Sequence, residues 1–89
     1  MKPVKNITVI GDGGWGTTLA VLLAKKGFGV TIWGIFPDYV EILKSDRENI
    51  KFLPGVKIPP QVKITSDISE AVAKADLIVL PRDARGGAA

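Results

Sequence analysis

The chain has 89 residues, a net charge of +3, a hydrophobic fraction of 46% and a charged fraction of 24%. These values are typical of one ordinary globular domain and exclude an intrinsically disordered chain. Cysteine and histidine are both absent, which excludes a disulfide framework, thiolate chemistry and a zinc site. The positive residues are scattered and form no basic stripe, so we expect no nucleic-acid partner.

The N-terminal apolar run is too short for a signal peptide or a membrane span. We therefore expect no membrane insertion and, by default, a cytoplasmic location. Apolar β-branched runs that end at turn residues predict strands over 6–10, 30–33, 62–65 and 77–80. Helical periodicity predicts helices over 15–26 and 37–46 and a third helix that follows Asp67.

Each predicted helix carries its own signals in the sequence. Gly27 ends the first helix, Pro37 suits the first position of the second, and Asp67 with Glu70 forms a capping-box pattern for the third. The apolar positions are Trp15, Leu19, Leu22 and Leu23 in the first helix, Val40 and Leu43 in the second, and Ile68, Ala71, Val72 and Ala75 in the third. The segment 49–60 contains Pro-Gly and Pro-Pro pairs and predicts an ordered loop.

Strands and helices alternate along the whole pattern, which predicts a parallel sheet with helices on its faces and right-handed crossovers. The expected fold class is therefore α/β, a partial Rossmann fold with a parallel four-stranded sheet and three helices. The fourth strand would leave an open sheet edge, and open edges pair with other chains. We expect a homodimer through that edge.

The sharpest motif is Gly11-Asp12-Gly13-Gly14-Trp15-Gly16, a G-x-G-x-x-G match between a predicted strand and a predicted helix. Gly11 would allow the tight turn, Gly13 the close approach of a pyrophosphate, and Gly16 tight helix–strand packing. Free N–H groups near Gly14 and Trp15 would face the anion. The motif alone also fits a tight turn that binds nothing.

The second half of the dinucleotide fingerprint is missing. An acidic residue is expected about twenty residues past the glycines, but Trp33-Gly34-Ile35-Phe36 occupies that place. Asp38 is the nearest carboxylate, and we expect it within the first turn of the next helix. Ile35 and Phe36 would either form an apolar wall for the adenine or pack where strand meets helix. Both NAD and NADP therefore remain candidate cofactors.

Several segments resemble bacterial NAD(P)-dependent glycerol-3-phosphate dehydrogenases. Residues 9–20 are similar to the family's G-x-G-S/N-W-G-T-A-L-A opening, and Val30-Thr31-Ile32-Trp33-Gly34 to its V-x-L-W-G/S segment. Residues 46–59, with Arg47-Glu48-Asn49 and Phe52-Leu53-Pro54-Gly55, resemble the family's R-E-N-x-x-Y/F-L-P-G stretch. The long connection is unusual for a strand–helix fold.

The resemblance implies interconversion of dihydroxyacetone phosphate and sn-glycerol 3-phosphate with NADH or NADPH, which yields a phospholipid precursor. The implied cofactor-binding residues are Gly11, Gly13, Gly14, Trp15, Gly16, Ile35 and Phe36. Gly14 replaces the family's usual Ser or Asn, and Ile35 stands where many relatives have Arg or His. We expect residues 1–80 to be a truncated NAD(P)-binding Rossmann domain and residues 81–89 an irregular tail, either frayed or an artificial remnant.

The family's catalytic and substrate-binding lysines have no counterpart in the chain, so we expect no catalytic residue before residue 89 and no activity from the chain alone. Lys51 and Lys57 lie on the predicted loop and are expected to be solvated. The alternative function is a non-catalytic dinucleotide- or phosphate-binding Rossmann module. A different dehydrogenase family of the same topology, such as the 3-hydroxyacyl-CoA or 6-phosphogluconate dehydrogenases, is disfavoured by the segment 48–59.

Overall fold

The computed structural model describes residues 3–81, so the predicted tail lies, from residue 82 onward, outside the described residues. The elements along the chain are β1 (Asn6–Ile10), α1 (Gly14–Lys25), β2 (Gly29–Trp33), α2 (Pro37–Asp46), β3 (Glu48–Asn49), β4 (Leu53–Lys57), β5 (Lys63–Thr65), α3 (Ile68–Val72) and β6 (Leu77–Val79). Four of the strands form a parallel sheet in the order β5-β2-β1-β6. In a doubly wound fold the first four strands lie in the order 3-2-1-4, and β5-β2-β1-β6 is the same order. The predicted fold class is therefore confirmed.

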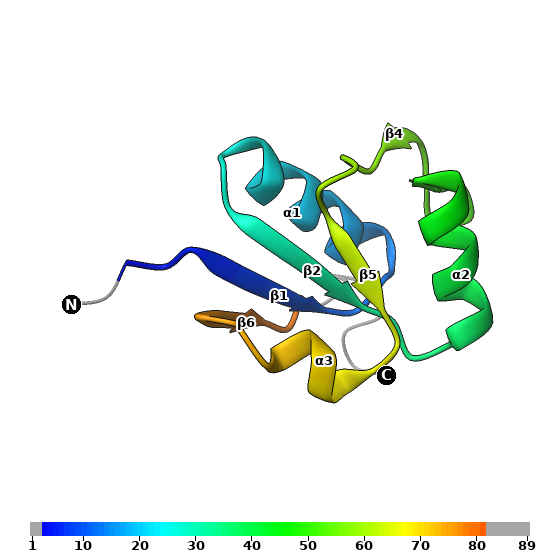
Figure 1. The fold of residues 1–89 in the computed structure, drawn as a ribbon. Helices are drawn as coiled ribbons and strands as arrows, with labels where there is room; N and C mark the ends of the chain where they lie inside the picture. The colour runs from blue at the N-terminus through cyan, green and yellow to red at the C-terminus, as the bar shows by residue number, and fades with distance from the viewer. Residues whose placement is uncertain (1–2, 82–89) are drawn as a thin grey trace.

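Two layers of helix cover the sheet, α1 and α2 on one face and α3 on the other (Figure 1). Successive side chains of a strand point to opposite faces. Val9, Ile32 and Ile64 are direct partners across β1, β2 and β5, and all three lie in the core beneath α1 and α2. Thr8 points to the opposite face, where its hydroxyl donates to the carbonyl of Ala71 in α3. The crossover through α3 carries the chain to the far side of β1.

The core is built from small and β-branched side chains. Its buried members are Val9, Ala20, Ala24, Val30, Ile32, Val40, Leu43, Ile58, Val62 and Ile64. Helix α2 begins with Pro37 in its first turn and buries Val40 and Leu43, which confirms both predictions. The Asp67 carboxylate accepts a hydrogen bond from the N–H of Glu70 and caps α3 as predicted.

The predicted apolar faces of α1 and α3 are wrong in part. Trp15 is 59% exposed and Leu22 is 52% exposed. The residues of α1 that are buried are Gly16, Thr17, Ala20, Val21 and Ala24. Small residues let the helix approach the sheet closely, so its larger apolar side chains are displaced to the flanks. In α3, Ala71 is buried but Ile68 is exposed, because the short helix touches the sheet through one turn.

The segment 49–60 is not simply a loop. Strands β3 and β4 form an antiparallel hairpin, with Glu48 opposite Lys57 and Asn49 opposite Leu53. Pro54 is tolerated because the hairpin has only two strands, and proline is confined to such edges. Gly55 has a φ of +87°, a conformation that a glycine adopts without steric cost. The Pro-Gly pair therefore lies inside a strand rather than in a turn.

The surface of the described residues has two further features relevant to function. Strand β6 is at one edge of the sheet and pairs with β1, so the predicted open edge exists. Leu77 and Ile78 on this strand are each nearly half exposed. Within residues 3–81, no helix combines the length and apolar character that a membrane span requires.

Candidate functional site

The carboxyl ends of β1 and β2 bring the two halves of the predicted cofactor site together. Ile10 and Trp33 are partners at the ends of these strands. The N–H of Gly11 donates to the carbonyl of Trp33 over 2.8 Å. The glycine loop and the segment 34–36 therefore leave the sheet side by side, at the edge where doubly wound proteins bind their ligands.

The physical requirement for glycine differs between the positions of the loop. Gly11 has a φ of +134°, a conformation that an L side chain rarely adopts. A Cβ on Gly16 would lie 2.5 Å from the carbonyl oxygen of Gly11, so α1 packs directly against the loop. Gly13 is the N-cap of α1, with φ −73° and ψ −177°. A Cβ on Gly13 would meet nothing within 4 Å, so neither its backbone conformation nor its packing requires a glycine.

Gly14 is held beneath the β3–β4 hairpin. A Cβ at this position would lie 2.6 Å from the carbonyl oxygen of Phe52. A serine or asparagine, which the resemblance places here, would force the hairpin to shift. The absence of a side chain at Gly14 therefore lets residues 50–52 approach the first turn of α1 directly.

Asn49 connects the hairpin to the glycine loop. Its side chain is fully buried, and its amide nitrogen donates to the carbonyl of Asp12 over 2.7 Å and to the hydroxyl of Thr17 over 2.8 Å. Its amide oxygen accepts from the hydroxyl of Tyr39 and from the N–H of Phe52. The Arg47-Glu48-Asn49 motif is visible in the sequence, but the contact of Asn49 with the glycine loop arises only in the folded chain, so no sequence signal predicts it.

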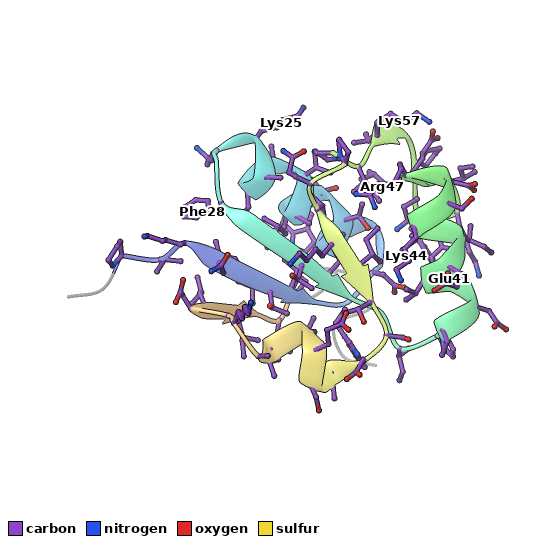
Figure 2. All side chains as sticks on the ribbon, in the orientation of Figure 1. Lys25, Phe28, Glu41, Lys44, Arg47 and Lys57 are labelled. Atoms are coloured by element: carbon purple, nitrogen blue, oxygen red, sulfur yellow. The ribbon has the colours of Figure 1, made fainter. Side chains whose placement is uncertain are left out.

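The two residues before Asn49 organise the rest of the hairpin. Arg47 has a φ of 53° and ends α2 in the left-handed conformation typical of helix C-termini. Its guanidinium donates to the carbonyls of Pro59 and Val62, and Figure 2 shows it between α2 and the hairpin. The Glu48 carboxylate accepts from the N–H of Gly55 and pairs with Lys57 over 3.2 Å. The N–H of Gly55 and then the ammonium of Lys57 lower the pKa of Glu48.

Asp12 has its carboxylate turned toward the end of β2. A Cβ on Gly34 would clash with Asp12 Oδ2, so only a glycine at residue 34 leaves room for this oxygen. This oxygen is buried and has no hydrogen-bond partner among the described residues. Burial raises the pKa of the Asp12 carboxyl. The pKa of the Tyr39 hydroxyl is raised first by its own burial and then by the negative charge of Asp12. The glycine motif allows any residue at position 12, so the sequence does not predict this placement of Asp12.

The predicted cofactor-contacting side chains lie at the rim of this edge. Trp15 is in the first turn of α1 and is exposed. Ile35 and Phe36 join β2 to α2 and are 62% and 66% exposed, so they do not pack into the core. The first N–H groups of a helix have no intrahelical partners, and Gly13 supplies no side chain to accept from them. Such a helix start favours an anion.

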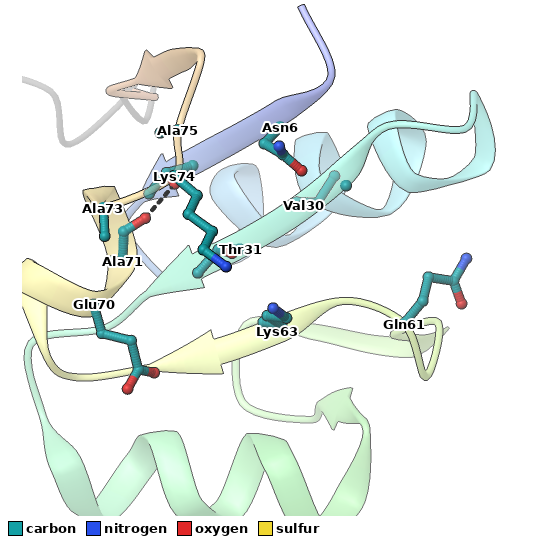
Figure 3. A pocket seen from close by; sticks show the side chains of 12 residues that line it. Asn6, Val30, Thr31, Gln61, Lys63, Glu70, Ala71, Ala73, Lys74 and Ala75 are labelled. Atoms are coloured by element: carbon teal, nitrogen blue, oxygen red, sulfur yellow. Dashed lines mark hydrogen bonds between the residues drawn. The ribbon is translucent and has the colours of Figure 1, made fainter.

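A pocket of about 350 Å³ lies elsewhere, between α3 and the far face of the sheet. Its lining includes Thr8, Thr31, Lys63 and Lys74, and Figure 3 shows Lys74 extended over Thr31. No residue of the glycine loop lines it. Among residues 3–81 there is no group of three or more acidic residues placed to hold a metal ion.

Replacing Asn49 with alanine is expected to lower the free energy of unfolding by about 1–3 kcal/mol, because it leaves buried partners without hydrogen bonds. Urea unfolding followed by circular dichroism measures this change. Asn6→Ala, at an exposed position, is the matched control and should change stability by less than about 0.5 kcal/mol. Superimposable unfolding curves for the two variants would show that the Asn49 contacts add nothing.

Asp12→Asn is expected to stabilise the chain at neutral pH. A carboxyl whose pKa is raised on folding binds its proton more tightly in the folded state. Its contribution to stability is therefore favourable at low pH and falls as pH rises from about 3.9, the ordinary aspartate pKa, through the raised folded value. The stability difference between Asp12→Asn and wild type should grow over that window and then level off. A difference that is independent of pH between 3 and 8 would contradict the burial of this carboxylate.

Comparisons with known proteins agree with this arrangement. The family described as NAD-dependent glycerol-3-phosphate dehydrogenase N-terminus matches residues 6–83. Over 73 residues the chain is 53% identical to a glycerol-3-phosphate dehydrogenase [NAD(P)+] of Prosthecochloris aestuarii and 51% identical to that of Chlorobium phaeobacteroides, covering 82% of this chain in each case. The crystal structure of glycerol-3-phosphate dehydrogenase from Coxiella burnetii superposes with a TM-score of 0.81 at 30% identity, over 86% of this chain and 24% of that one.

These relatives are much longer proteins, since the chain spans 22% of the length of the first two. The match nevertheless covers the glycine loop, the Arg47-Glu48-Asn49 segment and all four strands of the sheet. These are the same segments that form the candidate site at the carboxyl ends of β1 and β2. The chain belongs to the NAD-dependent glycerol-3-phosphate dehydrogenase family, in the region that the family description assigns to the N-terminus.

Proposed function

We propose that the chain is the dinucleotide-binding part of an NAD(P)-dependent glycerol-3-phosphate dehydrogenase, and that it holds the adenosine and pyrophosphate of the cofactor. The observation that carries this proposal is the environment of Gly13. Each of the other described glycines has either a positive φ or a neighbour that a Cβ would strike. Gly13 has neither, and it lies at the start of α1.

A glycine that the fold does not need is explained by something that approaches its backbone. In a dinucleotide site the second glycine of the motif leaves room for the pyrophosphate. The N–H groups of Gly14 and Trp15 lie directly behind it, at the positive end of a helix of 12 residues. The empty space at Gly13 and these donors together fit a pyrophosphate.

The proposal gives the other predicted residues separate tasks. Gly11 supports the turn and Gly16 holds α1 against it, so both act through the shape of the loop. Ile35 and Phe36, which are exposed at the neighbouring strand end, supply an apolar wall for the adenine. Apolar and aromatic side chains of this kind line most cofactor sites. The alternative in which these two residues are ordinary packing is disfavoured by their exposure.

We assign the reaction to the longer polypeptide typical of the relatives. When bound, the nicotinamide supplies the hydride that interconverts dihydroxyacetone phosphate and sn-glycerol 3-phosphate, a step toward phospholipid precursors. The chain's own residues bind and orient the cofactor and provide no catalytic group. Residues 1–80 as one cofactor-binding domain, and a cytoplasmic location, are parts of the same proposal. The alternative, a non-catalytic binding module, shares the site but not the reaction.

Gly13→Val is expected to fold and to weaken NADH binding by at least about tenfold, because its side chain fills the space proposed for the pyrophosphate. Titration with NADH, followed by tryptophan emission, measures the change. Its stability cost should be about 1 kcal/mol, the usual scale for an N-cap change. Ala73→Val, at an exposed position beyond α3, is the matched control and should bind as wild type does. Equal affinity of both variants would reject the pyrophosphate site.

We also propose that the chain forms a homodimer through the open edge of β6. Unpaired strand edges join when nothing covers them, and Leu77, Ile78 and Leu80 are exposed beside this edge. Sedimentation velocity over a concentration series should show a dimer. Ile78→Lys, which places a charge on the edge, should shift the chain to monomer. A wild-type chain that sediments as a monomer at every concentration would contradict the proposal.

A further inference from the structure

The end of β2 lacks the acidic residue that dinucleotide-binding folds use there. This acid normally accepts hydrogen bonds from the ribose hydroxyls of NAD, whereas an arginine nearby accommodates the 2′-phosphate of NADP. Here the strand ends with Trp33 and continues through Gly34, Ile35 and Phe36. Neither group that normally discriminates the two cofactors is present in this segment.

A carboxylate reaches the same place from the glycine loop. Gly34 follows β2 directly, and an ideal Cβ on it would clash with Asp12 Oδ2 and lie 2.8 Å from the Cγ2 of Val40. The Asp12 carboxylate therefore occupies the space that a side chain at residue 34 would fill. The hydrogen bond from Gly11 to Trp33 fixes the two segments relative to one another.

The charge of Asp12 is not neutralised within the described residues. Its Oδ2 has no hydrogen-bond partner, and the hydroxyl of Tyr39, whose pKa the Asp12 charge helps to raise after the larger effect of burial, donates to Asn49 instead. The ion pairs of residues 3–81 join Lys44 to Glu41 and Lys57 to Glu48, away from this carboxylate. A buried polar atom without a partner costs free energy, so a hydrogen bond donated to this carboxylate by a bound molecule would be favourable.

Within residues 3–81, no free arginine lies beside the end of β2 to hold a second phosphate. Arg47 is the one arginine in residues 3–81, and its guanidinium is engaged by the carbonyls of Pro59 and Val62. The segment from Trp33 to Val40 contains no lysine or arginine. A 2′-phosphate bound here would meet the Asp12 carboxylate without a compensating charge from residues 33–40 or from Arg47.

We propose that Asp12 determines which dinucleotide the site accepts, by standing in for the missing acid of β2 and selecting NAD over NADP. Like charges repel, and in a partly buried site water and salt screen that repulsion less than at an exposed surface. A ribose hydroxyl, in contrast, donates hydrogen bonds to a carboxylate. This inference rests on the dinucleotide binding proposed above and adds its specificity. Asp12 acts as a specificity-determining residue and takes no part in hydride transfer.

The test compares NADH with NADPH on the same protein. Wild type, Asp12→Asn, Asp12→Ser and Asp38→Asn are each titrated with both dinucleotides, and binding is followed by tryptophan emission and by calorimetry. Asp38 is the matched control, because it is an exposed carboxylate in the first turn of α2. The ratio of the two affinities is compared between variants. Partial unfolding of a variant weakens both ligands equally and leaves this ratio unchanged.

We expect wild type to bind NADH at least about tenfold more tightly than NADPH. Both Asp12 variants should narrow this ratio by about tenfold, chiefly through tighter binding of NADPH, and Asp38→Asn should keep the wild-type ratio. An unchanged ratio in the Asp12 variants, a change that appears in Asp38→Asn instead, or equal wild-type affinity for both ligands overturns the inference while dinucleotide binding stands. Absence of saturable binding of either ligand to the folded chain overturns the proposed function and this inference together.

Discussion

The hydrogen bonds of the Asn49 side chain are the constraint on which the site depends. This one amide group hydrogen-bonds to Asp12 in the glycine loop, to Thr17 in α1 and to Tyr39 in α2. The sheet alone fixes only where the glycine loop begins, at Gly11. Its path beyond that point is set by a residue from the β3–β4 hairpin, so the unusual length of the connection after α2 has a structural purpose.

The hairpin is itself stabilised by local charges rather than by a large core. Glu48 pairs with Lys57 and accepts from Gly55, while Arg47 binds the carbonyls of the return segment. Exposed ion pairs contribute little stability, but Arg47 also satisfies carbonyls of partly buried backbone, which has more weight. Arg47, Glu48 and Asn49 thus bind three different sets of partners, so each has a separate task in positioning the hairpin.

Much of the fold was predictable, because periodicity reports directly on strands and helices. All four sheet strands and all three helices lie where apolar runs, Pro37 and the Asp67 cap place them. The buried face of α1 was not predictable from hydrophobicity, since close packing selects Ala20 and Ala24 over Leu22. The sequence does not predict the hairpin, because Pro54 and Gly55 are typical of turns. The two strands are held together by contacts of Glu48 with Gly55 and Lys57, which form only in the folded chain. The position of the Asp12 carboxylate depends on Gly34, far along the chain, and no local pattern encodes such a contact.

The contacts of Asn49 also bear on how the chain folds. They join residues 32 and 37 positions apart, so the chain between them must close into a long loop before they form. Closing such loops costs entropy and slows folding relative to local contacts. The first strand, α1 and β2 have neighbouring partners and can assemble without the hairpin. During synthesis the glycine loop therefore acquires its final shape only after the chain through Asn49 has emerged from the ribosome.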